Sequence, residues 1–87
     1  TQMKFDKSMR EAILRERMKT IQRELGNKGE DKEIIEYKKK IKKAKMPVDV
    51  EKKALKELVR LTKMHTFNPE AGYIRTYLDW LIDMPWQ

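Results

Sequence analysis

Hydrophobic residues are densest in the last part of the sequence, between residues 68 and 86. Asn68 can cap a helix that begins at Pro69, and Pro85 cannot continue one, so the pattern predicts a helix between them. One apolar face of this helix contains Ile74, Tyr77, Leu78 and Leu81, and a second contains Tyr73, Trp80 and Met84. A helix that is apolar around most of its circumference is normally buried. We therefore expect the other helices to pack on this one, with a core that includes Ile74, Tyr77, Trp80 and Leu81.

The N-terminal part of the sequence predicts one long helix, because residues 3–25 contain neither glycine nor proline. Leu14 is followed by apolar residues at intervals of four, three and four, namely Met18, Ile21 and Leu25. This spacing is typical of a helix face that packs against a partner helix. Ile21 and Leu25 are therefore predicted core residues. Such a helix spans about 35 Å, more than the remaining short helices can cover, so its front half should project. Gly26 is expected to end it.

The middle of the sequence predicts two further helices, separated by Met46 and Pro47. Residues 31–45 carry a narrow apolar stripe of Ile34, Tyr37, Ile41 and Ala44, with Ile41 in the core. The next helix runs to Met64 and has a wide apolar face, which places Leu55 and Leu58 in the core. Short connections favour antiparallel neighbours. The sequence thus predicts an all-α fold without strands, in which one long N-terminal helix (residues 1–26) is followed by a compact three-helix bundle (residues 27–87), as a single unit of a larger chain.

Charge is distributed unevenly along the chain, whose formal net charge is +7. The first 46 residues hold most of the basic side chains, whereas residues 68–87 carry one basic and three acidic side chains. A basic front favours an acidic partner, which can be nucleic acid or an acidic protein surface.

Catalytic chemistry can be tested by counting residue types. The chain has no cysteine, its one serine is Ser8, and its one histidine is His65, in a different predicted element. A catalytic triad needs its members within hydrogen-bond reach, and a zinc site needs several histidine or cysteine ligands. The three glycines, at positions 26, 29 and 72, do not form a phosphate-binding loop. These counts exclude an enzyme and a metal site in this segment, and no apolar run is long enough to span a membrane.

Three motifs, in order, resemble the Lon protease family. Residues 14–26 read L-R-E-R-M-K-T-I-Q-R-E-L-G, similar to the family's L-R-E-Q-M-K-A-I-Q-K-E-L-G. Lys45-Met46-Pro47 is similar to the family's Gly-Met-Pro, and residues 77–86 resemble the Tyr-Leu-Asp-Trp-Leu and Pro-Trp run that precedes its ATPase module. The sequence departs from the family at Ala12 and Ile13, where tyrosines are common, and at Lys45, which replaces a C-cap glycine and suggests a different exit from its helix.

The resemblance implies a part of a larger machine. Lon is an ATP-dependent serine protease built as a hexamer, and this chain resembles the helical region between its N-terminal domain and its ATPase. The phosphate-binding loop, the Ser–Lys dyad, ATP and magnesium would all lie outside the segment, which needs no cofactor. Expected partners are unfolded or damaged proteins and the neighbouring domains and subunits of the hexamer, without a membrane. We expect a cytoplasmic location, and a monomer when the segment is isolated.

Two features of the sequence are candidate binding surfaces. The first is an apolar strip suited to exposed hydrophobic segments of unfolded proteins, consisting of Met3, Phe5, Met9, Ile13, Leu14 and Met18. Its C-terminal members can instead be core, and its N-terminal members can pair with a neighbouring subunit's helix. The second is a basic face suited to weak, salt-dependent DNA contacts or simply to solvent, consisting of Lys38, Lys39, Lys42, Lys43 and Lys45. If neither binds, the segment is a structural spacer or oligomerisation helix.

The last helix offers a third possibility. We expect Tyr77 and Trp80 to pack in the core with Asp79 as a hydrogen-bond acceptor, because buried tyrosine and tryptophan need polar partners. The alternative is that Asp79, Asp83 and Trp86 seat the bundle on the ATPase module, which would leave Trp86 exposed in this segment.

Overall fold

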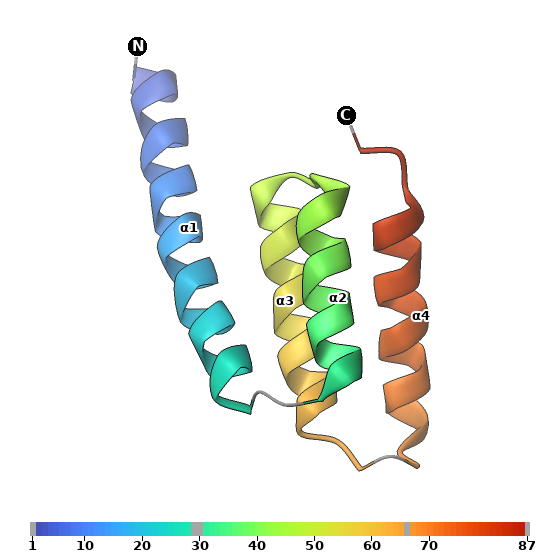
Figure 1. Ribbon diagram of the computed structural model, residues 1–87. Helices are drawn as coiled ribbons and strands as arrows, with labels where there is room; N and C mark the ends of the chain where they lie inside the picture. Colours follow the sequence, from blue (N-terminus) through green and yellow to red (C-terminus); the bar gives the residue numbers. More distant parts are fainter. Residues whose placement is uncertain (1, 29–30, 66, 87) are drawn as a thin grey trace.

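The computed structural model describes the backbone of residues 2–28, 31–65 and 67–86 and the side chains of residues 6–25, 31–65 and 67–86. Within these ranges all regular structure is helical: α1 (Gln2–Lys28), α2 (Lys32–Ala44), α3 (Val48–Thr62) and α4 (Pro69–Asp83) (Figure 1). The predicted all-α class is confirmed. α1 continues through Gly26 to Lys28, so the helix does not stop at the glycine as expected.

The helix on which the others pack is α3. It contacts α1, α2 and α4, and α2 also contacts α4. α3 can serve all three because its buried side chains cover a broad face, made of Ala54, Leu55, Leu58, Val59 and Leu61. The expectation that the other helices pack on residues 68–86 holds for α2 and α3, but the central helix is α3, and α4 lies at the edge of the molecule against α2 and α3 (Figure 1).

The core is one continuous cluster to which all four helices contribute. Its most deeply buried large side chains are Leu25, Ile41, Leu55, Leu58 and Leu78. Among the predicted core residues, the buried ones are Ile21, Leu25, Ile41, Leu55, Leu58, Ile74 and Leu81. The C-terminal half of α1 is thus tied to the bundle, whereas Figure 1 shows its N-terminal half leaning away from α2 and α3.

Two predicted core residues, Tyr77 and Trp80, are not in the core. Tyr77 is 39% exposed and Trp80 is 72% exposed. α4 buries a different set at a spacing of three, four and three, namely Ala71, Ile74, Leu78 and Leu81. Because α4 is an edge helix, only one of its two apolar faces meets the core, and the prediction for Tyr77 and Trp80 is wrong.

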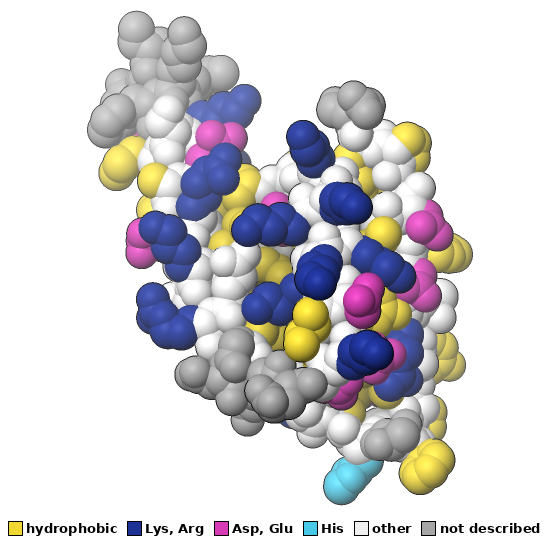
Figure 2. Space-filling view, viewed as in Figure 1, with side chains coloured by type: hydrophobic (Ala, Val, Ile, Leu, Met, Phe, Trp, Pro, Cys, Tyr) yellow, Lys and Arg dark blue, Asp and Glu magenta, His cyan; other side chains and the backbone are white. Residues whose placement is uncertain are grey.

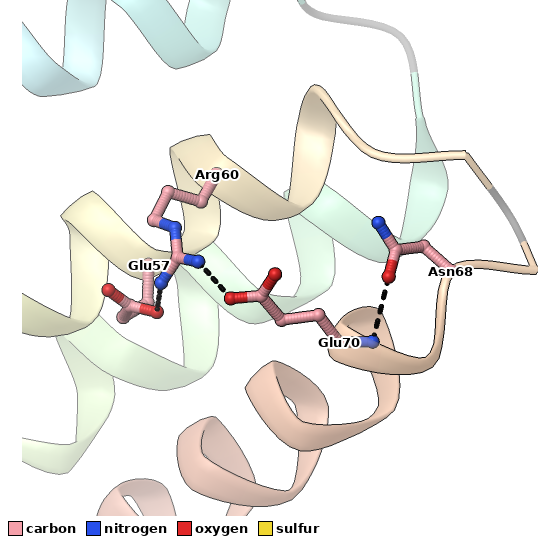
Figure 3. A network of polar contacts seen from close by, with 4 residues as sticks. All are labelled: Glu57, Arg60, Asn68 and Glu70. Carbon is pink, nitrogen blue, oxygen red and sulfur yellow. Dashed lines mark hydrogen bonds and ion pairs between the residues drawn. The ribbon is translucent and has the colours of Figure 1, made fainter.

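Polar contacts at both ends of α4 hold it in place. Asn68 Oδ1 accepts a hydrogen bond from the Glu70 backbone N–H at 2.9 Å, the predicted N-cap. The Arg60 guanidinium on α3 contacts Glu57 at 2.8 Å and also contacts Glu70, so it bridges α3 to the first turn of α4 (Figure 3). At the other end the Trp86 indole N–H donates to the Leu81 carbonyl at 2.6 Å. Trp86 is half-buried against the core rather than left exposed.

The connection between α2 and α3 depends on an unusual lysine conformation. Lys45, the C-cap residue of α2, has φ 57° and ψ 43°, which is the left-handed helical region. It is the one described non-glycine residue with a positive φ. This is the conformation that a glycine commonly adopts after a helix, so the prediction that lysine changes the exit is wrong. Lys45 adopts this left-handed conformation although its Cβ is sterically disfavoured there.

We predict that Lys45→Gly stabilises the fold by up to about 1 kcal/mol, because glycine adopts the left-handed conformation without the Cβ clash. Urea unfolding followed by helical circular dichroism measures the effect. Lys45→Ala is the control: it removes the same charge and keeps the Cβ, so it should not stabilise the protein. Equal gains from both variants would contradict the assignment of strain to the backbone.

Candidate functional site

The apolar strip predicted on the first helix divides into two separate surfaces. Residues four apart on a helix share a face, whereas consecutive residues point about 100° apart. Leu14 is half-buried and Met18 is buried in the core, so this part of the strip faces the bundle. Met9 and Ile13 lie on a different face of α1, and each is 50% exposed. The side chains of Met3 and Phe5 lie outside the described residues.

Leu14 contributes to a groove between α1 and the α2–α3 connection. The groove has a volume of about 510 Å³, and its apolar lining includes Leu14, Met46 and Val48. Charged side chains of both signs surround it: Lys7, Arg10, Arg15, Glu11 and Asp49. Three basic and two acidic groups leave the rim only weakly basic, and the lining mixes charged with apolar surface.

The lysine face on α2 is only partly free for a ligand. Lys39, Lys42, Lys43 and Lys45 are exposed, and Lys38 is half-buried. Lys38 and Lys42 line a shared hollow with Glu51 of α3. Burial raises the pKa of Glu51, and Lys42 and Arg15 oppose that shift by stabilising the carboxylate. Figure 2 shows dark-blue basic side chains gathered over α1 and α2. The basic face therefore exists, but Lys42 also compensates an acidic side chain of the protein itself.

Phe67, in the connection before α4, is 94% exposed, and three further exposed aromatic side chains lie on α4 itself. We call the α4 stripe the large side chains on the uncovered face of α4, Tyr73, Tyr77 and Trp80, together with Met84 just beyond the end of the helix. Tyr73 is 77% exposed, and the other three are also solvent-accessible. The spacing of four, three and four is visible in the sequence, but the apolar character of these residues equally favours burial. What the sequence does not show is which of the two apolar faces of α4 meets the core.

Two polar contacts fix the rotation of α4 and thereby expose the stripe. Asp79, the expected hydrogen-bond acceptor, accepts a hydrogen bond from the Tyr37 hydroxyl of α2 at 3.0 Å. Arg75 donates from Nε and Nη2 to the two carboxylate oxygens of Glu33, at 2.7 and 3.3 Å. Such a two-pronged contact is more geometrically specific than a single ion pair. Both contacts join α4 to α2, on the side of α4 away from the stripe.

No catalytic centre is assembled from the candidate residues. Ser8 is exposed on α1, and His65 is exposed in the connection between α3 and α4. Within the described ranges, His, Asp and Glu side chains form no group of three that could hold a metal ion. None of the helices, as far as they are described, is long and apolar enough to cross a membrane.

The comparisons with known proteins identify the family. No protein-family model matches the chain. The chain is 55% identical over 80 residues to a Lon protease of Trichlorobacter lovleyi, covering 92% of this chain and 10% of that protein. It is 54% identical over 84 residues to Lon protease 1 of Thermus thermophilus, covering 94% and 10%. With a Lon protease of Methylocella silvestris it shares 51% identity over 87 residues, covering 99% and 11%.

These matches confirm the resemblance seen in the motifs. The chain is a helical segment of the Lon protease family, and it spans about a tenth of the length of the relatives it matches.

We predict that Tyr37→Phe destabilises the protein by about 1 kcal/mol near neutral pH, the usual worth of a hydrogen bond. Burial and the hydrogen bond to Asp79 raise the pKa of Tyr37 to about 12. The folded state therefore favours the protonated hydroxyl, and the stability it contributes is lost as the pH rises from 10 to 12. Urea unfolding across this range should show a smaller decline for Tyr37→Phe than for the unmodified chain. Tyr73→Phe, at an exposed position, should change neither the stability nor its pH dependence.

Proposed function

We propose that the chain is the substrate-engaging and coupling region of a Lon-type ATP-dependent protease. In this proposal it contacts exposed hydrophobic segments of unfolded or damaged proteins and passes them to the ATPase ring. Residues 1–26 act as a projecting arm, and residues 27–87 form the three-helix bundle that carries it. ATP, magnesium and the proteolytic serine belong to other parts of the parent protein.

The observation that carries the proposal is the half-exposure of Met9 and Ile13 on α1. The opposite seam of the helix already supplies its packing on the bundle, through Met18, Ile21 and Leu25. Met9 and Ile13 therefore add little to the stability of the segment. An unbranched methionine adapts to many apolar shapes, which suits a surface that must accept unrelated sequences.

The groove next to Leu14 supports the same function. It opens between α1 and the α2–α3 connection, and its lining adds the side chains of Met46 and Val48 to the apolar surface of the arm. An extended segment could contact both the groove and the exposed face of α1. Each contact is small, so capture by one chain should be weak, and several linked copies in the parent protein would strengthen it through avidity.

We predict that a permanently unfolded, apolar, neutral protein shifts the NMR signals of residues 6–18 in the isotope-labelled chain. The double variant Met9→Ser, Ile13→Ser should weaken this binding by about tenfold or more, since two apolar contacts worth roughly 1 kcal/mol each are lost. Ile35→Ser is the matched control, because Ile35 is also a partly exposed isoleucine, on α2. It should bind as the unmodified chain does.

The titration also decides between capture and the spacer alternative. A folded protein of the same composition should give no shifts if the segment recognises exposed apolar chain. If the unfolded protein gives none either at millimolar concentration, the segment only sets the distance between neighbouring domains. Equal loss in the Ile35→Ser control would mean that the interaction is not located on α1.

The lysine face supports a second candidate function, non-specific DNA binding. Lys39, Lys42 and Lys43 line one open hollow on α2, so three ammonium groups can reach one phosphate backbone. Tyr37, the aromatic residue within the lysine run, is buried, which leaves no base-stacking group on this face.

For this candidate we predict binding to duplex DNA that is independent of sequence and is lost as salt rises. Changing Lys39, Lys42 and Lys43 to Gln should reduce the slope of log affinity against log salt by about one for each lysine that contacts a phosphate. Fluorescence anisotropy at several salt concentrations measures the slope. Lys19→Gln, on α1, is the control, and an unchanged slope in the triple variant would rule out the α2 face.

A further inference from the structure

The five methionine side chains that the structure describes differ widely in their exposure to solvent. Met9 on α1 is 50% exposed, and Met84, just beyond the end of α4, is 49% exposed. Met18 and Met46 are buried in the core, at 8% and 5% exposure. Met64 is partly buried against the same core. Two of these sulfur atoms are therefore accessible to small reagents in the surrounding water.

Hydrogen peroxide oxidises an accessible methionine to the sulfoxide without a catalytic group. The thioether sulfur gives an electron pair to one peroxide oxygen, so a sulfur–oxygen bond forms while the oxygen–oxygen bond breaks. The departing hydroxide takes the hydrogen of the transferred oxygen and leaves as water. The sulfur is oxidised by two electrons, the peroxide is reduced by two, and methionine sulfoxide reductases reverse the change. Because the peroxide must reach the sulfur, exposure decides which methionines react.

Oxidation at position 9 leaves the fold in place. α1 is held on α3 through its buried side chains Met18, Ile21 and Leu25, and Met9 lies about two and a half turns before the first of them. A sulfoxide at position 9 stays in contact with water, so no polar group is buried without a partner. At Met18 or Met46 the same polar group would be forced into the core. The fold thus exposes a methionine that tolerates oxidation and shields two that do not.

The same oxidation changes the chemistry of the α1 surface to which we assign substrate contact. Met9 and Ile13, about one turn apart, are the two exposed apolar side chains on which that assignment rests. A thioether is apolar and flexible, whereas a sulfoxide carries a strongly polar sulfur–oxygen bond that water solvates. An apolar segment that covers position 9 must displace this water, which costs free energy. The sulfoxide therefore disfavours the contact, and Ile13 alone does not replace it.

We propose that Met9 is a site of reversible oxidation by peroxides, and that its sulfoxide lowers the affinity of α1 for unfolded proteins. This inference rests on the proposed function, because it assigns a control to the same surface. A chain exposed to peroxide binds less substrate until a reductase restores the thioether. A leucine at position 9 would offer a similar apolar contact without this sensitivity, so the sensitivity is a property of the methionine.

Peptide mass spectrometry after limited treatment with hydrogen peroxide measures the modification itself. All chains in the experiment carry Met3→Leu, so that position 9 holds the one methionine before Met18. We expect Met9 and Met84 to gain one oxygen atom several times faster than Met18 and Met46, and a methionine sulfoxide reductase to remove it. Circular dichroism verifies that the treated chain is still helical. Oxidation of Met9 no faster than that of the buried pair would overturn the proposal.

The NMR titration with the unfolded protein, repeated after peroxide treatment, measures the consequence. Oxidation of the Met3→Leu chain should weaken binding by about fivefold or more, because one apolar contact is lost and a polar group must be desolvated. Adding Met9→Leu should preserve binding before the treatment and keep it unchanged afterwards. Adding Met84→Leu is the matched control, since Met84 is equally exposed but lies at the end of α4. This control should lose affinity on oxidation as the Met3→Leu chain does.

The outcomes separate the oxidation of Met9 from the function on which its effect depends. Unchanged affinity in a chain whose Met9 is fully oxidised would overturn the proposal, and so would an equal loss of affinity in the Met9→Leu variant. If the untreated chain does not bind the unfolded protein at all, the proposed function fails, and the control assigned to its surface fails with it. The mass measurement is independent of binding and still decides whether Met9 is oxidised selectively.

Discussion

The burial of α3 is the constraint on which the rest of the structure depends. Its apolar face, built around Leu55 and Leu58, is broad enough to need cover from three directions. α1, α2 and α4 supply that cover, and each turns one narrow apolar face inward to do so. The arrangement of the helices follows from this: α3 lies in the centre, and each of the other helices has a face that does not pack on the core.

The unused faces carry the candidate binding surfaces. α1 is longer than the bundle it packs on, so its C-terminal half is fixed by Leu25 while Met9 and Ile13 stay accessible. α4 is fixed by Arg75 and Asp79 to α2, and this fixed rotation turns Trp80 outward. The segment thus combines a rigid centre with two apolar surfaces of different composition: methionine and isoleucine on α1, aromatic residues on α4. The proposed function, in which the segment holds substrates and contacts neighbouring parts of the protease, needs both a rigid centre and exposed apolar surface.

The sequence was sufficient for the elements and for much of the core, and insufficient for the arrangement. Caps such as Asn68 and breakers such as Pro85 act through the local backbone, so the ends of α4 could be predicted from neighbouring residues alone. The exposure of Trp80 could not, because it depends on which neighbours α4 has, and both of its faces are apolar. Lys45 is a second case in which local preference does not decide the structure. Lysine disfavours the left-handed conformation, yet Lys45 adopts it because the short connection between two packed helices requires it. The strip on α1 was predicted as one surface because consecutive residues Ile13 and Leu14 are both apolar, although the helix turns them to different sides.

The most direct test of the account is photo-crosslinking in the complete protease, with a photoreactive amino acid at position 9 and an unfolded substrate present. If α1 engages substrates, the crosslinked product contains the substrate, and its yield falls when a second unfolded protein competes. The same probe at position 35 on α2 provides the background. Crosslinks from position 9 only to other parts of the protease, unchanged by substrate, would contradict the account and make α1 a spacer between domains.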